Sequence, residues 1–167
     1  YSYVERAVFY WTDAEEIKII RQEARRGKVL VFVDRMSRIR NLVKELEDEF
    51  AGEIATACSS YRPEAREFDG LEEVLQDGKL RKRITIVTTV FYNGVNIKDP
   101  ELTCIISRLW DPIVNAQILG RKRPVNKQDT CAVYFKGFSH DRIKQEREHI
   151  RKRQLEPAKK WKDGRSD

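Results

Sequence analysis

Two short segments of the sequence contain residue types that bind phosphate groups. The first is Thr88-Thr89-Val90-Phe91-Tyr92-Asn93-Gly94-Val95-Asn96, which includes the end of an apolar, β-branched run that predicts a buried strand. Gly94 lets the backbone approach a ligand closely, and Asn96 can hydrogen-bond a ribose or phosphate oxygen. Thr88 and Thr89 offer hydroxyls and backbone amides to a phosphodiester chain. Tyr92 can stack on a nucleobase. The alternative interpretation is an ordinary turn between two strands.

The second segment is Gln117-Ile118-Leu119-Gly120-Arg121-Lys122-Arg123. Three cations surround one glycine near the end of a stretch with helical character. The planar guanidinium groups of Arg121 and Arg123 match phosphate oxygens and keep their charge at any working pH. The segment therefore predicts phosphate binding. A solvated, cationic helix end that is favoured by the helix dipole is the alternative.

The pattern of apolar residues predicts an α/β fold. Short apolar runs at 6–11, 29–33, 53–58, 84–90, 103–109 and 130–135 predict six strands. The stretches between them predict helices capped by Thr12 and Ser37, a helix from Pro63 to Asp77-Gly78, and a helix through Gln117. This alternation favours an open, mostly parallel sheet with helices on both faces. Such sheets bind ligands beyond the carboxyl ends of their strands, and we expect both phosphate-binding segments at one edge.

The chain divides by composition into a domain and a tail. We expect one α/β domain at residues 1–138 and a charged helical extension at residues 139–167. Acids and bases alternate densely in the extension, which favours a solvated helix that runs to Leu155 and stops before Pro157.

Charge and composition narrow the function classes. A formal net charge of +6 and a pI near 9.3 favour a polyanionic partner such as nucleic acid. No run of about 20 uncharged apolar residues predicts a membrane span, and the first residues lack signal-peptide features, so we expect a cytoplasmic protein. The sequence carries no signal for the oligomeric state, and a monomer is the default expectation. Cys58, Cys104 and Cys131 have no paired spacing and indicate small buried side chains rather than a disulfide or a metal site.

Taken in order, these segments resemble the last two signature motifs of superfamily 2 helicases and translocases. The family pattern T-x-x-x-x-x-G-x-D matches at Thr88, Gly94 and, with Asn in place of Asp, Asn96. The pattern Q-x-x-G-R-x-x-R matches at Gln117, Gly120 and Arg121. The stretch KVLVFVDR resembles the strand-entering motif at the start of the family's second lobe, and LQDGKLRKRITIVTT resembles the helix–Gly–Lys–strand segment that leads to the threonine. The resemblance covers residues 28–138 and implies a RecA-like fold.

The resemblance also implies a function and a set of site residues. The chain would be the second motor lobe of an ATP-dependent helicase or translocase, with ATP and Mg²⁺ held mainly by a first RecA-like lobe outside this sequence. The residues implied to face the nucleotide are Arg121, Arg123, Gly94, Asn96, Gln117 and Gly120. The residues implied to line a groove for a DNA or RNA backbone are Asp34, Arg35, Ser59, Ser60, Thr88, Thr89 and Tyr92. Helix-cap and turn roles are the alternative for Asp34, Arg35, Ser59 and Ser60.

One position departs from the family pattern more seriously than Asn96. Pro124 occupies the place of the final arginine, which in the family is the usual candidate for an arginine finger. Either Arg123 acts from a shifted backbone, Arg121 acts alone, or the lobe is impaired. The sequence also contains no G-x-x-x-x-G-K-[ST] loop and no D-E-x-[DH] motif, which belong to the first lobe. We therefore expect no ATP hydrolysis by this fragment alone.

Two other functions compete with the motor lobe. Pro124 motivates a non-catalytic, helicase-like module that binds nucleic acid or protein. The third hypothesis is a flavodoxin-like or Rossmann-like domain for a small phosphate ligand. Against it, the turn Asp34-Arg35-Met36-Ser37 has no glycine fingerprint.

Overall fold

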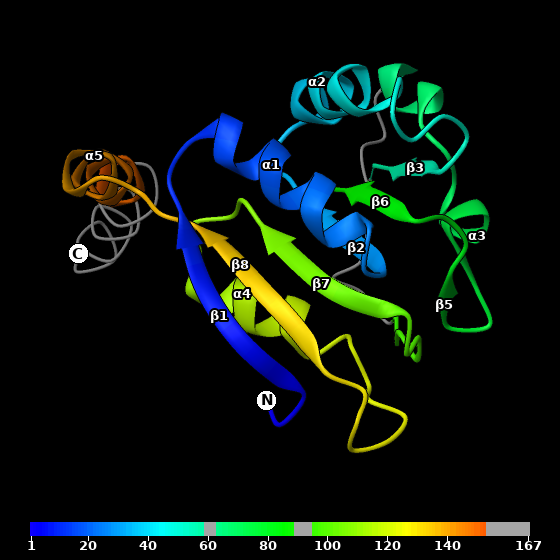
Figure 1. Ribbon diagram of the computed structural model, residues 1–167. Helices are drawn as coiled ribbons and strands as arrows, with labels where there is room; N and C mark the ends of the chain where they lie inside the picture. The colour runs from blue at the N-terminus through cyan, green and yellow to red at the C-terminus, as the bar shows by residue number, and fades with distance from the viewer. Residues whose placement is uncertain (59–62, 89–94, 153–167) are drawn as a thin grey trace, which may run out of the picture. The chain divides into compact units, whose positions relative to one another are not determined.

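The computed structural model describes residues 1–58, 63–88 and 95–152 (Figure 1). The chain forms two compact units, Tyr1–Lys136 and Gly137–Asp167, which are described separately. Five residues predicted to lie in the site fall outside the described residues: Ser59, Ser60, Thr89, Tyr92 and Gly94.

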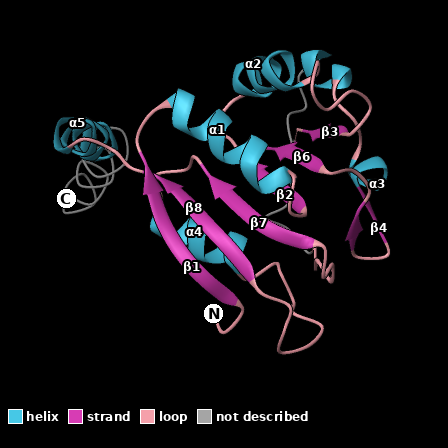
Figure 2. Cartoon of the chain, in the orientation of Figure 1, coloured by secondary structure: helices cyan, strands magenta, loops and turns pink. Residues whose placement is uncertain are grey.

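A six-stranded sheet forms the centre of the first unit (Figure 2). Its strands are β1 (Val4–Tyr10), β2 (Lys28–Phe32), β3 (Ile54–Ala57), β6 (Ile84–Val87), β7 (Leu102–Ser107) and β8 (Cys131–Lys136). They lie in the order β1-β8-β7-β2-β6-β3, and each neighbouring pair is parallel. The predicted open parallel α/β sheet is confirmed.

Side chains on β2 alternate between two apolar layers, because successive residues of a strand point to opposite faces. Val29 and Val31 pack with α1 (Asp13–Ala24) and α2 (Met36–Leu46) on one face. Leu30 and Phe32 pack on the other face with residues of α3 (Leu71–Val74) and α4 (Pro112–Leu119). Helices therefore cover both faces, as predicted. The continuous apolar run of β2 is explained by its burial from both sides.

The helix starts are partly as predicted. Thr12 and Glu15 form a complete capping box at the start of α1, which confirms that prediction. At α4, Asp111 accepts hydrogen bonds from the Ile113 and Val114 amides. Ser37 was predicted to cap α2, and this is wrong. The helix begins two residues earlier than a cap at Ser37 predicts, at Met36, with Arg35 at the cap position and no side-chain hydrogen bond there.

The predicted single helix from Pro63 to Asp77-Gly78 is also wrong. The chain forms a 3-10 helix, η1 (Pro63–Glu67), then α3, then a short hairpin of β4 (Leu75–Gln76) and β5 (Lys79–Leu80). Asp69 interrupts the helix because its carboxylate accepts the Thr56 amide at 2.8 Å beside β3. Asp77 and Gly78 both have positive φ, 52° and 76°, which is the geometry of a two-residue hairpin turn.

The second unit contains α5 (His140–Ile150), whose first turn is capped by Ser139. The prediction that this helix continues to Leu155 extends beyond the described residues. No helix within the described ranges is long and apolar enough to cross a membrane. In the first unit, the predicted burial is confirmed for Cys104 and Cys131, whereas Cys58 is partly exposed.

Two glycines with positive φ provide a test of how closely the turn between β4 and β5 packs. A Cβ at Gly78 would lie 3.3 Å from the Asn96 carbonyl oxygen, whereas a Cβ at Gly52 would meet nothing within 4 Å. Both alanine variants strain the backbone by about 1 kcal/mol. We expect Gly78→Ala to lower the free energy of unfolding more than Gly52→Ala in urea denaturation. Equal losses would contradict close packing of this turn against the Asn96 segment.

Candidate functional site

The described end of the first predicted phosphate-binding segment, at Asn96, lies beside the second segment. The Ile97 amide donates to the Arg121 carbonyl at 2.8 Å, and the Arg123 amide donates to the Ile97 carbonyl at 2.8 Å. These bonds form a parallel bridge between Ile97 and Lys122. Asn96, which precedes this bridge, is exposed, and its Oδ1 lies 3.3 Å from the Arg123 Nε that donates to it.

The burial of the Lys122 side chain was not predicted from the sequence. Its side chain is fully buried, forms an ion pair with buried Asp129 and donates to the Asp99 carbonyl at 3.1 Å. The interpretation of Lys122 as a third phosphate-binding cation is therefore wrong. Because the side chains of an extended segment alternate in direction, burial of Lys122 turns its two neighbours outward. Arg123 is exposed and Arg121 is partly exposed.

Two tyrosines hold the helix end that precedes these arginines. The Tyr1 hydroxyl donates to the Ala116 carbonyl at 2.6 Å, and the Tyr3 hydroxyl donates to the Leu119 carbonyl. The Leu119 carbonyl is at the C-terminus of α4, where the last carbonyls of a helix lack intrahelical donors, whereas the Ala116 carbonyl also accepts the Gly120 amide at 3.0 Å. Burial raises the pKa of Tyr3, so the hydroxyl remains a donor. A Cβ at Gly120 would lie 3.3 Å from the Tyr1 hydroxyl, so a glycine suits this close contact.

The remaining predicted residues lie at the carboxyl ends of two neighbouring strands, β2 and β6. Asp34 and Arg35 follow β2, are exposed, and form an ion pair of 3.4 Å. Thr88 follows β6 and is buried, and its amide donates to the Ala57 carbonyl at 3.1 Å. The Thr88 amide was expected to be available to a phosphodiester, and this bond contradicts that expectation. The structure thus separates the site residues into an Asn96–Arg123 group and a strand-end group.

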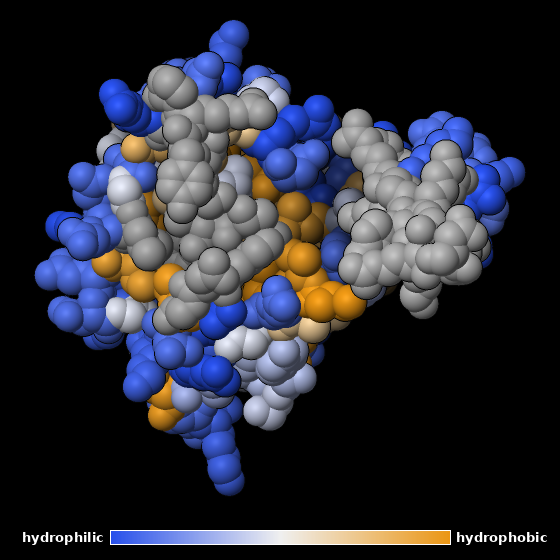
Figure 3. Space-filling view, turned by 180° about the vertical axis from the view of Figure 1, so that it is seen from behind, coloured by the Kyte–Doolittle hydropathy of each residue, from blue (hydrophilic) through white to orange (hydrophobic). Residues whose placement is uncertain are grey.

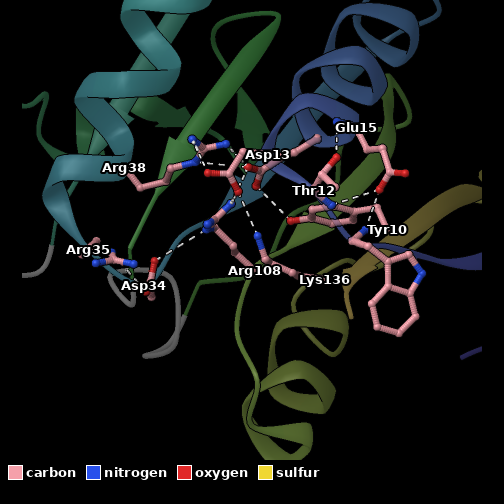
Figure 4. Close-up of polar contacts among 11 residues, drawn as sticks. Tyr10, Thr12, Asp13, Glu15, Asp34, Arg35, Arg38, Arg108 and Lys136 are labelled. Carbon is pink, nitrogen blue, oxygen red and sulfur yellow. Dashed lines mark hydrogen bonds and ion pairs between the residues drawn. The ribbon is translucent and has the colours of Figure 1, made fainter. Parts of the chain in front are cut away.

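A buried charge network at the same edge was not predicted (Figure 4). Glu16, in the first turn of α1, is fully buried. Its carboxylate accepts from the Tyr10 hydroxyl at 2.9 Å, Arg38 Nε at 3.1 Å and Arg108 Nη1 at 2.8 Å. These partners come from β1, α2 and the segment after β7, so one carboxylate joins three elements.

Asp13 extends the network toward solvent. It accepts from Arg108 at 2.7 Å and from Lys136, at the end of β8, at 2.9 Å. Burial opposes ionisation of Asp13, but the hydrogen bonds from Lys136 and Arg108 outweigh it and lower the pKa of the carboxyl group. Arg108 Nε also lies 3.8 Å from Asp34. The network therefore reaches the strand-end group through Asp34.

A signal for this network exists in the sequence. Glu16 stands four residues before Ile20, and Glu23 stands one before Ala24, so two acids fall on the buried stripe of α1. A buried acid requires a paired cation, because an unpaired buried charge is costly. The cations that pair with Glu16, however, come from positions far away in the sequence, and no local sequence pattern identifies them.

Comparison with known proteins supports the fold. No protein-family profile and no curated protein sequence matches this chain. Among solved structures, S. cerevisiae Dbp5 bound to RNA and ADP BeF3 aligns over 90% of this chain with a TM-score of 0.60 and 14% identity. The match spans only 39% of that Dbp5 chain.

Two further structures match over most of their own length. The C-terminal domain of the DEAD-box protein Dbp5 aligns over 86% of this chain and 81% of its own, with a TM-score of 0.57 and 15% identity. The E. coli DEAD-box protein SrmB, bound to regulator of ribonuclease activity A, aligns over 84% and 80%, with a TM-score of 0.56 and 14% identity. The chain therefore has the same RecA-like α/β fold as the C-terminal domain of Dbp5.

The buried network around Glu16 predicts that two isosteric substitutions lower the free energy of unfolding by different amounts. Glu16→Gln leaves Arg38 and Arg108 without their buried partner, and we expect the free energy of unfolding to fall by about 3 kcal/mol. Glu67→Gln removes the exposed pair with Arg40 and should cost at most about 1 kcal/mol. Urea denaturation measures both values. A Glu16→Gln variant as stable as Glu67→Gln would show that the network does not hold this edge together.

Proposed function

We propose that this chain is the second motor lobe of an ATP-dependent nucleic-acid helicase or translocase. The observation that carries the proposal is the backbone pairing of Ile97 with Arg121 and Arg123. It sets an amide side chain, Asn96, beside an exposed guanidinium at the end of α4, where Gln117 is also exposed. Guanidinium groups match phosphate oxygens, and amides suit ribose hydroxyls.

ATP with Mg²⁺ would be held mainly by a first RecA-like lobe. Arg121 and Arg123 would approach the phosphates from across the cleft between the lobes and stabilise negative charge there. Asn96, Gln117 and Gly120 would border the same nucleotide. The outward direction of Arg123 supports this role, because a neighbouring lobe can reach it. The structure of Dbp5 bound to RNA and ADP BeF3 supports a nucleotide and nucleic-acid role for this fold.

A nucleic-acid backbone would run along the carboxyl ends of β2 and β6. These strands are adjacent in the sheet, so Asp34, Arg35 and Thr88 lie along one edge. Arg35 offers an exposed cation there, with its side chain 66% exposed. Contacts of this kind bind phosphate and carry no base information. This predicts binding to single strands without sequence preference.

A second candidate function is a non-catalytic module that binds a protein or nucleic acid. Two observations favour it: Pro124 at the final arginine position, and apolar side chains exposed on the face that carries α4 (Figure 3). Ile113 and Trp110 are 69% and 47% exposed there. The SrmB structure contains a bound protein regulator, which gives a precedent for such use of this fold.

ATP hydrolysis separates the two functions. In the protein that carries this chain together with a first lobe, we expect Arg121→Ala or Arg123→Ala to lower nucleic-acid-stimulated ATPase activity by about 10³-fold or more, because an arginine finger contributes that much. Nucleic-acid binding should persist in both variants, and Lys127→Ala, at an exposed position in the following loop, serves as the control. Full activity in both arginine variants would contradict the motor function and favour the binding module.

A further inference from the structure

A hollow of about 540 Å³ lies at the amino-terminal edge of the sheet, where β2, β6 and β7 begin. We call it the amino-edge pocket. Its lining residues are Arg26, Gly27, Lys28, Glu53, Arg81, Lys82, Arg83, Pro100, Glu101 and Thr103. Asp34, Thr88 and Arg108 follow the opposite ends of the same strands. The amino-edge pocket is therefore separate from the strand-end group, which would contact nucleic acid in the proposed motor function.

Cations outnumber acids in this lining by five to two. Lys28 is paired with Asp99 at 3.1 Å and with Glu101 at 2.6 Å, and Arg83 is 3.3 Å from Glu53. Two acids behind the lining also contact these cations: Asp99, which is fully buried, pairs with Lys28, and buried Glu23 lies 3.6 Å from Arg26. The side chains of Glu53 and Glu101 are 49% and 70% exposed, so the contacts that these two acids make lie at the surface. Exposed pairs of this kind contribute little free energy, and a phosphate group can replace the carboxylate.

Lys82 and Arg83 are positioned by backbone carbonyls rather than left to move in solvent. Lys82 Nζ donates to the Gly52 carbonyl at 2.6 Å, and Arg83 Nη1 donates to the Ala24 carbonyl at 2.9 Å. The Ala24 carbonyl belongs to the C-terminus of α1, where the helix dipole favours a cation. Cations that are ordered before binding lose less conformational entropy when a ligand arrives.

Gly27 and Thr103 form a close-packed part of the pocket wall. A Cβ at Gly27 would lie 2.5 Å from Thr103 Oγ1 and 2.8 Å from the Glu101 carbonyl oxygen. Glycine therefore lets the start of β2 lie against the start of β7. This contact brings Arg26 and Lys28, on either side of Gly27, to the same hollow as the Arg81-Lys82-Arg83 run.

We propose that the amino-edge pocket binds a compact ligand that carries several phosphate groups. Arginine forks and lysine ammonium groups are the donors that recognise phosphate oxygens. The volume falls within the range of small-ligand sites. A single-stranded nucleic acid instead requires an extended basic track with stacking aromatic rings, and none of the described residues that line this hollow is aromatic.

Calorimetric titration of the 167-residue chain with inorganic tripolyphosphate tests the proposal. We expect saturable binding that weakens as salt is added. Arg81→Glu combined with Lys82→Glu should weaken binding by at least about tenfold, since both exposed cations become acids. A milder pair, Arg81→Gln with Lys82→Gln, should weaken binding without changing the thermal unfolding midpoint.

The control is Lys18→Glu combined with Lys44→Glu, at exposed positions on α1 and α2. It lowers the formal net charge from +6 to +2, as the Arg81 and Lys82 reversal does. Unchanged binding by this control supports a localised site. The absence of saturable binding, or an equal loss in the control, overturns the proposal.

Competition with a single-stranded oligonucleotide of about 12 nucleotides separates a compact ligand from a nucleic-acid backbone. We expect the oligonucleotide to leave tripolyphosphate bound and to bind the Arg81 and Lys82 variants as it binds the unaltered chain. Displacement of tripolyphosphate, together with loss of oligonucleotide binding in those variants, would overturn the compact-ligand proposal. Because this test involves no ATP hydrolysis and uses other residues, its outcome is independent of the proposed motor function.

Discussion

The buried ammonium group of Lys122 is the constraint on which the geometry of the candidate nucleotide site depends. Placing a charge in the protein interior costs several kcal/mol unless it is paired and hydrogen-bonded. Here Asp129 supplies the paired charge, and the Asp99 carbonyl supplies a further acceptor. The second carboxylate oxygen of Asp129 accepts the Val125 amide at 3.0 Å. Lys122 cannot turn outward without leaving the buried Asp129 carboxylate without its counter-charge, so Arg123 is directed to the surface and Arg121 is partly exposed.

Asp99 links the segment that contains Lys122 to the amino-terminal edge of the sheet. Its carboxylate accepts from Lys28 Nζ at 3.1 Å, the Leu80 amide at 2.9 Å and the Glu101 amide at 3.0 Å. Its carbonyl accepts from Lys122. One fully buried residue thus joins the starts of β2 and β7, the β5 strand and the arginine segment. At the carboxyl edge, Glu16 joins β1, α2 and the end of β7 in the same way. The sheet is held at both edges by buried acids with several partners each.

The fold was largely predictable from the sequence because its signals are local. The continuous apolar run of β2, the helical spacing of Ile39, Leu42 and Leu46, and the Thr12–Glu15 capping box each determine nearby structure. The region after Pro63 was not predicted, because Asp69 leaves a helical pattern to bond a strand that precedes it by 13 positions. The turn Asp77-Gly78 carried a hairpin signal that was interpreted as a helix end.

The residue types of the candidate site were predictable from the sequence, but the directions in which their side chains point were not. The order of the two segments indicated that Asn96 and the arginines come together, and the Ile97 pairing brings them together. The sequence could not show which of the three adjacent cations is buried, because the burial of Lys122 depends on Asp99 and Asp129, 23 and 7 positions away. The same applies to Arg38 and Arg108, whose partner Glu16 is 22 and 92 positions away. Long-range pairing of charges leaves no periodic pattern.

Hydrogen–deuterium exchange of this chain, with and without a single-stranded oligonucleotide of about 12 nucleotides, tests most directly whether the carboxyl edge binds nucleic acid. The account predicts slower exchange after β2, at residues 34–38, and at the end of β6, with no change at residues 79–83. Protection confined to residues 79–83, or binding without protection at either strand end, would contradict it.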